Sequence, residues 1–208
     1  MIESVKYKLE SINIDKPSQQ PKAAVLLGIC NYEAYVDQPA LIYTVRSSNL
    51  STHSGEVSFP GGKAEEGDAS LHHTAIREAQ EEINLNPDDV NFLGRMNYLI
   101  SKHKIEVNPI VASIDNPQKF IKNPEIEHIF TVPINYLLEK NNILEETIQR
   151  QGAKWIVPTW RYDNQKIWGL TAMITVNFLN HCFDAGIDRK STRLNSSHSS
   201  VSRMPSSA

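Results

Sequence analysis

The sequence predicts a layered α/β domain, and three features of the chain indicate this fold class. Short segments rich in valine, isoleucine and leucine recur along the chain, which is typical of β-strands. Two longer segments, residues 69–83 and 169–186, have the length and apolar pattern of helices. The 208 residues show no internal repeat and are ample for one domain with a sizeable core.

The predicted elements follow one another between residues 22 and 186. The strand pattern is shared by residues 22–32, 39–48, 55–62, 90–101 and 105–114, the first two of which are expected to pair. The helix pattern is shared by residues 69–83, a segment beginning after Pro133, and residues 169–186. We expect the third strand to end in a turn at Pro60, Gly61 and Gly62, followed by a polar loop and the first helix.

The two ends of the chain differ in composition from the middle. Residues 1–22 have no apolar core of an export signal, so we expect an N-terminal extension and a cytoplasmic protein. Residues 189–208 are rich in serine and resemble translated cloning sequence, which predicts a disordered, non-native tail. Residues 23–188 are then the predicted domain. Without the tail, 17 basic residues face 24 acidic ones, a formal charge near −7, which argues against a nucleic-acid-binding face.

Two further properties limit the class of protein. No apolar stretch approaches the roughly 18–20 residues that a membrane-spanning helix needs, so no membrane insertion is expected. Cys30 and Cys182 are the only cysteines, and two free buried thiols are favoured over a disulfide in the absence of an export signal.

The helix at residues 69–83 concentrates three carboxylates on one side. With 100° per residue, Glu78, Glu81 and Glu82 share an arc of about 100°. The apolar stripe lies on a separate arc and consists of Ala69, His72, Ile76, Ala79 and Ile83. His72 is therefore expected to be partly buried and hydrogen-bonded, and not to be a ligand.

The carboxylate arc has two interpretations. A solvated helix face is the ordinary one, but like charges at these spacings repel, and no lysine stands at helical spacing to relieve them. A hard divalent cation such as Mg²⁺ would convert this repulsion into binding. A glycine-rich turn before the helix could direct N–H groups of Gly61 and Gly62 toward a phosphate.

Residues 61–85, GGKAEEGDASLHHTAIREAQEEINL, resemble the Nudix box, whose core contains Arg-Glu, an apolar residue and a Glu-Glu pair. The resemblance implies a Nudix fold, with a mixed sheet sandwiched between helices, and a hydrolase of a nucleoside diphosphate linked to another group. Asn84 replaces the glycine that usually follows the glutamate pair. We expect a left-handed conformation there, which asparagine tolerates best among non-glycine residues. The loop is one residue longer than usual, and Asp68 stands near the position of the early glutamate.

A second motif lies upstream. LIYTVRSSNLSTHSGEVSFPGG, residues 41–62, resembles the motif of the coenzyme A diphosphatase branch, with Arg46, His53, Gly61 and Gly62 as implied substrate-binding residues. Ser51 stands where that motif has an arginine, and this departure weakens the coenzyme A assignment. Segments at 123–138 and 167–174 also resemble the family.

The resemblance implies hydrolysis of coenzyme A or acyl-CoA to (acyl-)4′-phosphopantetheine and adenosine 3′,5′-bisphosphate. Glu78 and Glu82, supported by Glu81, would bind Mg²⁺ or Mn²⁺. The general base is left open between Glu78, Glu81 and a loop carboxylate such as Glu125. Arg77 would brace the loop as a structural residue.

Other interpretations remain open from the sequence alone. The alternatives are a Nudix hydrolase of NADH or ADP-ribose and a Nudix-like binding module without catalysis. A coenzyme A-type small molecule is the expected partner, without nucleic acid or membrane, and a homodimer is one option for the assembly. Lys102, His103 and Lys104 could reach a 3′-phosphate, but solvated loop charges are favoured.

Overall fold

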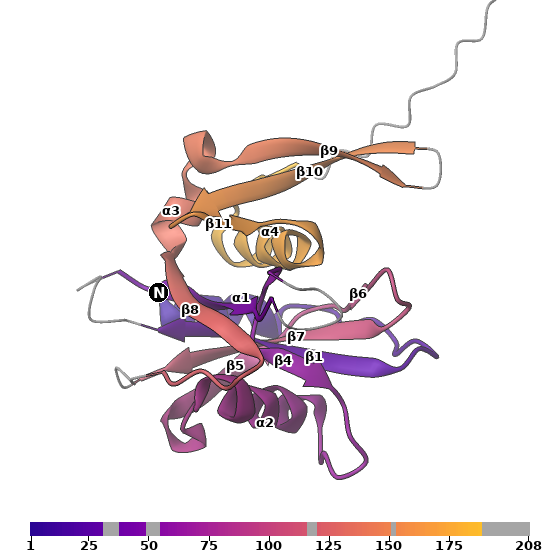
Figure 1. The fold of residues 1–208 in the computed structure, drawn as a ribbon, viewed down its shortest axis with the longest axis vertical. Helices are drawn as coiled ribbons and strands as arrows, with labels where there is room; N and C mark the ends of the chain where they lie inside the picture. The colour runs from indigo at the N-terminus through magenta and orange to yellow at the C-terminus, as the bar shows by residue number, and fades with distance from the viewer. Residues whose placement is uncertain (31–37, 49–54, 116–119, 151–152, 189–208) are drawn as a thin grey trace, which may run out of the picture.

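The computed structural model describes residues 1–30, 38–48, 55–115, 120–150 and 153–188. A mixed β-sheet lies between helices: α2 (Leu71–Ile83) covers one face, and α4 (Gly169–Phe183) and α1 (Ile2–Glu10) lie on the other (Figure 1). This arrangement confirms the predicted fold class. The Cys30 and Cys182 thiols are free and buried, also as predicted.

The main sheet has eight strands among the described residues. They are β1 (Lys22–Cys30), β2 (Ala40–Arg46), β3 (Val57–Ser58), β4 (Gly61–Lys63), β5 (Val90–Arg95), β6 (Leu99–Ile100), β7 (Glu106–Ile114) and β8 (Ile126–Pro133). β1 pairs in parallel with β7 and antiparallel with β2, so the predicted pairing of the first two strands is confirmed. All nine residues of β7 are buried, because helices cover both faces of the sheet and neighbouring strands flank it.

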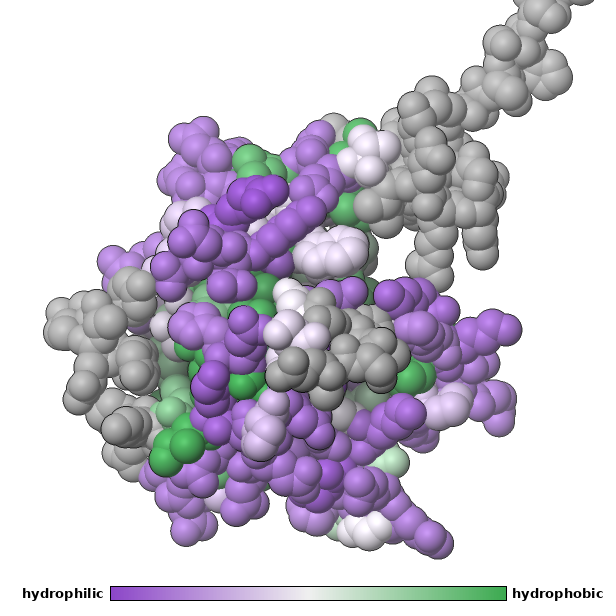
Figure 2. Space-filling view, viewed as in Figure 1, coloured by the Kyte–Doolittle hydropathy of each residue, from purple (hydrophilic) through white to green (hydrophobic). Residues whose placement is uncertain are grey.

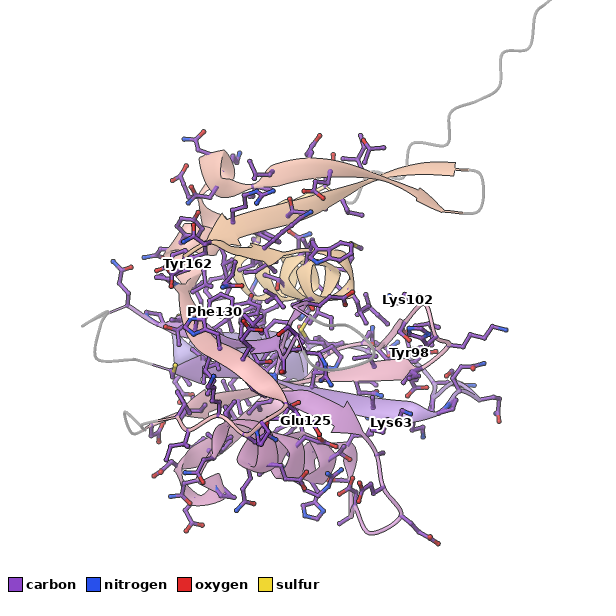
Figure 3. All side chains as sticks on the ribbon, viewed as in Figure 1. Lys63, Tyr98, Lys102, Glu125, Phe130 and Tyr162 are labelled. Atoms are coloured by element: carbon purple, nitrogen blue, oxygen red, sulfur yellow. The ribbon has the colours of Figure 1, made fainter. Side chains whose placement is uncertain are left out.

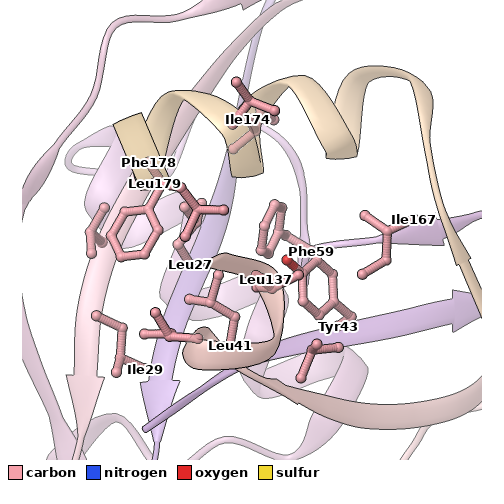
Figure 4. Close-up of a cluster of buried hydrophobic side chains, with 14 of the residues drawn as sticks. Leu27, Ile29, Leu41, Tyr43, Phe59, Leu137, Ile167, Ile174, Phe178 and Leu179 are labelled. Atoms are coloured by element: carbon pink, nitrogen blue, oxygen red, sulfur yellow. The ribbon is translucent and has the colours of Figure 1, made fainter. Parts of the chain in front are cut away.

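A second, three-stranded sheet packs on the far side of α4. It consists of β9 (Leu144–Arg150), β10 (Ala153–Tyr162) and β11 (Gln165–Ile167). α4 lies between the two sheets, which explains why its buried residues, including Ile174, Phe178 and Leu179, are not confined to a single stripe (Figure 4). Trp160 of β10 is fully buried, and its indole N–H donates to the Leu137 carbonyl at 3.1 Å.

One expectation about local structure was wrong, and two elements, β9 and α1, were not predicted. Gly61 and Gly62 do not form a turn but lie in β4, which pairs antiparallel with β1. The helix after Pro133, α3, ends at Leu138; a short 3-10 turn (Lys140–Asn142) follows, and residues 144–150 form β9. The N-terminal residues contain α1, whose Val5 and Leu9 are buried in the main core.

The site lies where β4 approaches α2. β3 and β4 enter the space between β1 and β2: β3 pairs with β2, and β4 pairs with β1. The register places Gly62 opposite Ala24 of β1. α2 packs over this part of the sheet through fully buried Ala75, Ala79 and Ile83. A 3-10 turn (Pro87–Asp89) then leads from α2 into β5.

Two observations concern the limits of the chain. Among the described residues, no helix is long and apolar enough to cross a membrane. The predicted disordered tail at 189–208 lies outside the described residues, as do His53 and Ser51.

Candidate active site

The helix that carries the carboxylates has defined ends. Ser70 is its N-cap, and its side chain accepts a hydrogen bond from the His73 N–H at 3.1 Å. Asn84 ends the helix with φ 55° and ψ 39°, which is the left-handed conformation expected of the residue that replaces glycine. The helix is therefore fixed at both ends, and so are the directions of its side chains.

Glu82 is the most buried of the three glutamates, with a side chain only 6% exposed. Its Oε2 accepts the Gly61 N–H at 3.0 Å, and Arg46 Nη1 lies 3.7 Å from its Oε1. Burial raises the pKa of Glu82 to about 7, although the Gly61 bond and Arg46 oppose the shift. The Gly61 N–H, which was expected to face a phosphate, thus donates to a carboxylate.

Glu78 lies directly against β4. A Cβ at Gly62 would overlap the Glu78 carboxylate, and a Cβ at Gly61 would overlap the backbone of β1. Gly61 leaves no room for a side chain, because its φ is 153° and the backbone of β1 is in contact, whereas a side chain at Gly62 would have to displace the Glu78 carboxylate. Burial raises the pKa of Glu78 as well, since its side chain is 17% exposed.

Arg77 connects the loop before the helix to the glutamates. Its Nε and Nη2 donate to the two oxygens of Asp68 at 3.0 and 3.1 Å, and Nη2 also donates to the Lys63 carbonyl. Its Nη1 donates to Glu78 Oε1 at 3.0 Å and Glu81 Oε1 at 3.3 Å. The Arg77 hydrogen bonds hold the pKa of Asp68 well below its usual range. The Arg77 guanidinium therefore connects the loop that carries Asp68, strand β4 and helix α2.

Arg46 and Glu125 lie across from the helix. Arg46 is the last residue of β2, next to an irregularity in the pairing with β8, and its Nη2 lies 3.8 Å from Glu125 Oε2. The Ser47 N–H donates to the Glu125 carbonyl at 2.7 Å, which fixes the segment before β8 against the end of β2. Figure 3 shows Glu125 at the end of β8 where the strand begins, above α2. Glu125 is thereby brought to the same site as Glu82.

Other predicted residues lie elsewhere. Lys102, His103 and Lys104 are exposed in the turn between β6 and β7, as expected of loop charges. His72 is partly buried against Phe92, with ring centroids 4.7 Å apart. The expected hydrogen bonding is not met at Nε2, which is buried and has no partner in the described part of the chain. His53 cannot be placed, since it lies outside the described residues.

An open hollow beside Arg46 was not predicted from the sequence. It has a volume of about 480 Å³ and is lined by Ser47, Ser48, Lys122, Asn123, Pro124, Ile126 and Glu127. No repeating pattern marks residues 122–127, so the only sequence signal was their resemblance to a family segment. The hollow belongs to the site because Arg46 and Glu125 are the chain neighbours of its lining.

The donor set fits a hard divalent cation. Glu78 and Glu82 present carboxylate oxygens from one helix face. Burial raises the pKa values of both side chains, so their charged forms cost more free energy than those of exposed glutamates. Within the described ranges, no three acidic, histidine or cysteine side chains already form a cluster of metal-ligand geometry. Arg77 and Arg46 instead lie beside the glutamates. Side-chain rearrangement would accompany ion binding.

Comparison with known proteins identifies the family. The NUDIX domain family model matches residues 22–159. Nudix hydrolase 15, mitochondrial, of Arabidopsis thaliana is 41% identical over 164 residues, which cover 76% of this chain and 57% of the relative. Mitochondrial coenzyme A diphosphatase NUDT8 of Homo sapiens is 35% identical over 158 residues, covering 74% of this chain and 66% of the relative. The uncharacterized Nudix hydrolase NudL of Pectobacterium atrosepticum is 36% identical, covering 75% and 80%.

A solved structure with a similar fold is a Nudix hydrolase from M. smegmatis, RenU, with a TM-score of 0.47 and 16% identity over 57% of this chain and 73% of that one. The chain spans only 57% and 54% of the two similar Arabidopsis proteins. The family model nevertheless covers most of the described domain, including the carboxylate helix and β4. The chain belongs to the Nudix hydrolase family.

Proposed function

We propose that this protein catalyses metal-dependent hydrolysis of the diphosphate in coenzyme A or acyl-CoA, giving (acyl-)4′-phosphopantetheine and adenosine 3′,5′-bisphosphate. The observation that carries the proposal is the convergence of buried Glu82, partly buried Glu78 and Arg46 beside the glycine strand β4. The coenzyme A substrate is supported by the upstream motif at residues 41–62 and by the similarity to human NUDT8.

The charges of the site favour a divalent cation as cofactor. Among the described residues, six carboxylates are in ion-pair range of two arginines, Arg46 and Arg77: those of Glu65, Asp68, Glu78, Glu81, Glu82 and Glu125. This cluster is therefore formally near −4 and would repel a diphosphate. Bound Mg²⁺ or Mn²⁺ would offset this charge and lower the pKa of a coordinated water.

Each residue has a proposed role. Glu78 and Glu82 hold the cation, with Glu81 in support from its exposed position. Arg46 lies near Glu82 and would neutralise a substrate phosphate, for which guanidinium geometry is well suited. Arg77 is a positioning residue, because it orients Glu78 and Glu81 while anchoring the loop.

The proton of the attacking water needs an acceptor. Glu78, Glu81 and Glu125 are the candidates, and the base must be within hydrogen-bond reach of that water. Single glutamine variants distinguish them by their pH profiles: only loss of the base removes the acidic limb of the kcat profile. Loss of a purely metal-binding carboxylate instead raises the Mg²⁺ concentration needed for half-maximal activity.

Substrate profiling tests the proposal. Purified protein is incubated with coenzyme A, acetyl-CoA, NADH or ADP-ribose, each with Mg²⁺, with Mn²⁺ or with EDTA, and the products are identified by mass spectrometry. We expect cleavage of the coenzyme A substrates, abolished by EDTA. A clear preference for NADH or ADP-ribose would overturn the substrate assignment, and tight binding without turnover of any substrate would identify a binding module. The cytoplasmic location stays a prediction, since similar proteins are named mitochondrial or chloroplastic.

A further inference from the structure

We propose that the hollow beside Arg46 binds the phosphorylated ribose of the substrate, with Lys122 facing the 3′-phosphate. This inference rests on the proposed function and names the part of the substrate that the hollow recognises. The 3′-phosphate distinguishes coenzyme A from NADH and ADP-ribose, which carry none, so the hollow would determine substrate specificity.

The position of the hollow places it next to the diphosphate. Its lining begins at Ser47, the residue after Arg46, and continues on both sides of Glu125. The Asn123 N–H donates to the Glu82 carbonyl at 3.0 Å, so the same segment also contacts the carboxylate helix. A substrate with its diphosphate at Arg46 and the glutamates would therefore have the hollow within reach across this segment, although the Arg46 and Glu125 side chains do not line it. Its volume of about 480 Å³ lies within the usual range of small-molecule pockets, about 300–1,000 Å³.

The lining has the chemistry of a phosphorylated sugar site. Among the described residues of the lining, Lys122 is the only one with a cationic side chain, and its ammonium donates to the Glu127 carbonyl, which directs it along the wall. A lysine ammonium is a compact charge with three donors and suits a phosphate monoester. The Glu127 carboxylate accepts the Ser48 N–H at 3.3 Å and has further lone pairs for a ribose hydroxyl. This mostly polar wall favours the ribose over an apolar acyl or pantetheine arm.

A second basic group provides the competing location. Lys102 lies in the exposed turn between β6 and β7, and Figure 3 shows it well separated from Glu125. Two side chains that are far apart in one view are at least as far apart in space. Lys102 is therefore not a neighbour of Glu125 or of the hollow beside it. Lys102→Ala is therefore a matched control for Lys122→Ala, because both substitutions remove one exposed lysine.

Calorimetric titration with nucleotide products tests the site without requiring turnover. The wild type and the two variants are titrated with adenosine 3′,5′-bisphosphate and with 5′-AMP in the presence of Mg²⁺. We expect the wild type to bind the bisphosphate about tenfold more tightly than 5′-AMP, as one charge-assisted contact allows. Lys122→Ala should reduce this ratio to near one with little effect on 5′-AMP binding, and Lys102→Ala should leave the ratio unchanged.

The outcomes separate this inference from the proposed reaction. A wild-type ratio near one, a ratio unchanged in Lys122→Ala, or a ratio lost in Lys102→Ala would overturn the assignment of the hollow. A parallel comparison of KM for coenzyme A and dephospho-CoA should show the same dependence on Lys122. Retention of the binding ratio without coenzyme A hydrolysis would refute the reaction and leave the phosphate site standing. Coenzyme A hydrolysis with equal binding of both nucleotides would refute only the site.

Discussion

Replacing Arg77 by lysine tests whether the guanidinium fork holds the site together. The guanidinium donates five hydrogen bonds, two of them to Asp68, whose side chain is 3% exposed. Lysine keeps the charge but has three donors on one nitrogen, so it cannot bond Asp68 in a fork and reach Glu78 at the same time. The loss of three hydrogen bonds at about 1 kcal/mol each predicts that the unfolding free energy falls by about 3 kcal/mol. The exposure of Glu81, 57%, reduces this loss in unfolding free energy to about 2 kcal/mol.

Urea denaturation followed by circular dichroism measures this change. Arg161→Lys is the matched control, because Arg161 is exposed on β10 and its substitution should change the unfolding free energy by less than about 0.5 kcal/mol. Activity should fall together with stability in Arg77→Lys, since Glu78 and Glu81 lose their shared donor. An Arg77→Lys protein as stable and active as the control would refute the bracing role.

The remaining predictions concern the carboxylates and the glycine strand. Glu82→Gln should lower kcat by at least a factor of about 10² with the circular dichroism spectrum unchanged, and unchanged turnover would contradict its role as a ligand. Gly62→Ala should lower kcat by about 10², because the new Cβ displaces the Glu78 carboxylate, whereas Gly67→Ala has open space and should retain full activity. The cost of Asp68→Asn, measured by denaturation, should be constant between about pH 6 and 8 and shrink below about pH 4. Because the pKa of Asp68 is lower in the folded protein than in the unfolded chain, its contribution to the unfolding free energy is complete above the unfolded-state pKa and is lost as the pH falls through the folded-state pKa. A destabilisation by Asp68→Asn that grows in acid would contradict this direction.

The sequence predicts most elements whose pattern is local. β1, β2, β7, α2 and α4 have continuous apolar runs or clear periodicity, and all five are present near their predicted positions. β9 was missed because residues 144–150, LEETIQR, favour a helix by composition, while antiparallel pairing with β10 stabilises the extended form. β4 was missed because two adjacent glycines indicate a turn. Their place in a strand follows from close contact with β1 and Glu78, which is a tertiary constraint.

The sequence does not distinguish the three glutamates by burial, whereas the structure buries them to different extents. Helical geometry alone puts Glu78, Glu81 and Glu82 on one arc and gives no reason for any of them to be buried. In the structure their side chains are 17%, 57% and 6% exposed, because β4 and Arg46 cover one edge of the arc and leave the other in solvent. A carboxylate that is buried beside a glycine strand loses little freedom when it binds a cation, while an exposed one must be ordered first. The order of burial therefore predicts that Glu82→Gln weakens Mg²⁺ binding most and Glu81→Gln least. Titration of Mg²⁺ into the substrate-free variants measures this order directly, and an inverse order would show that burial does not select the ligands.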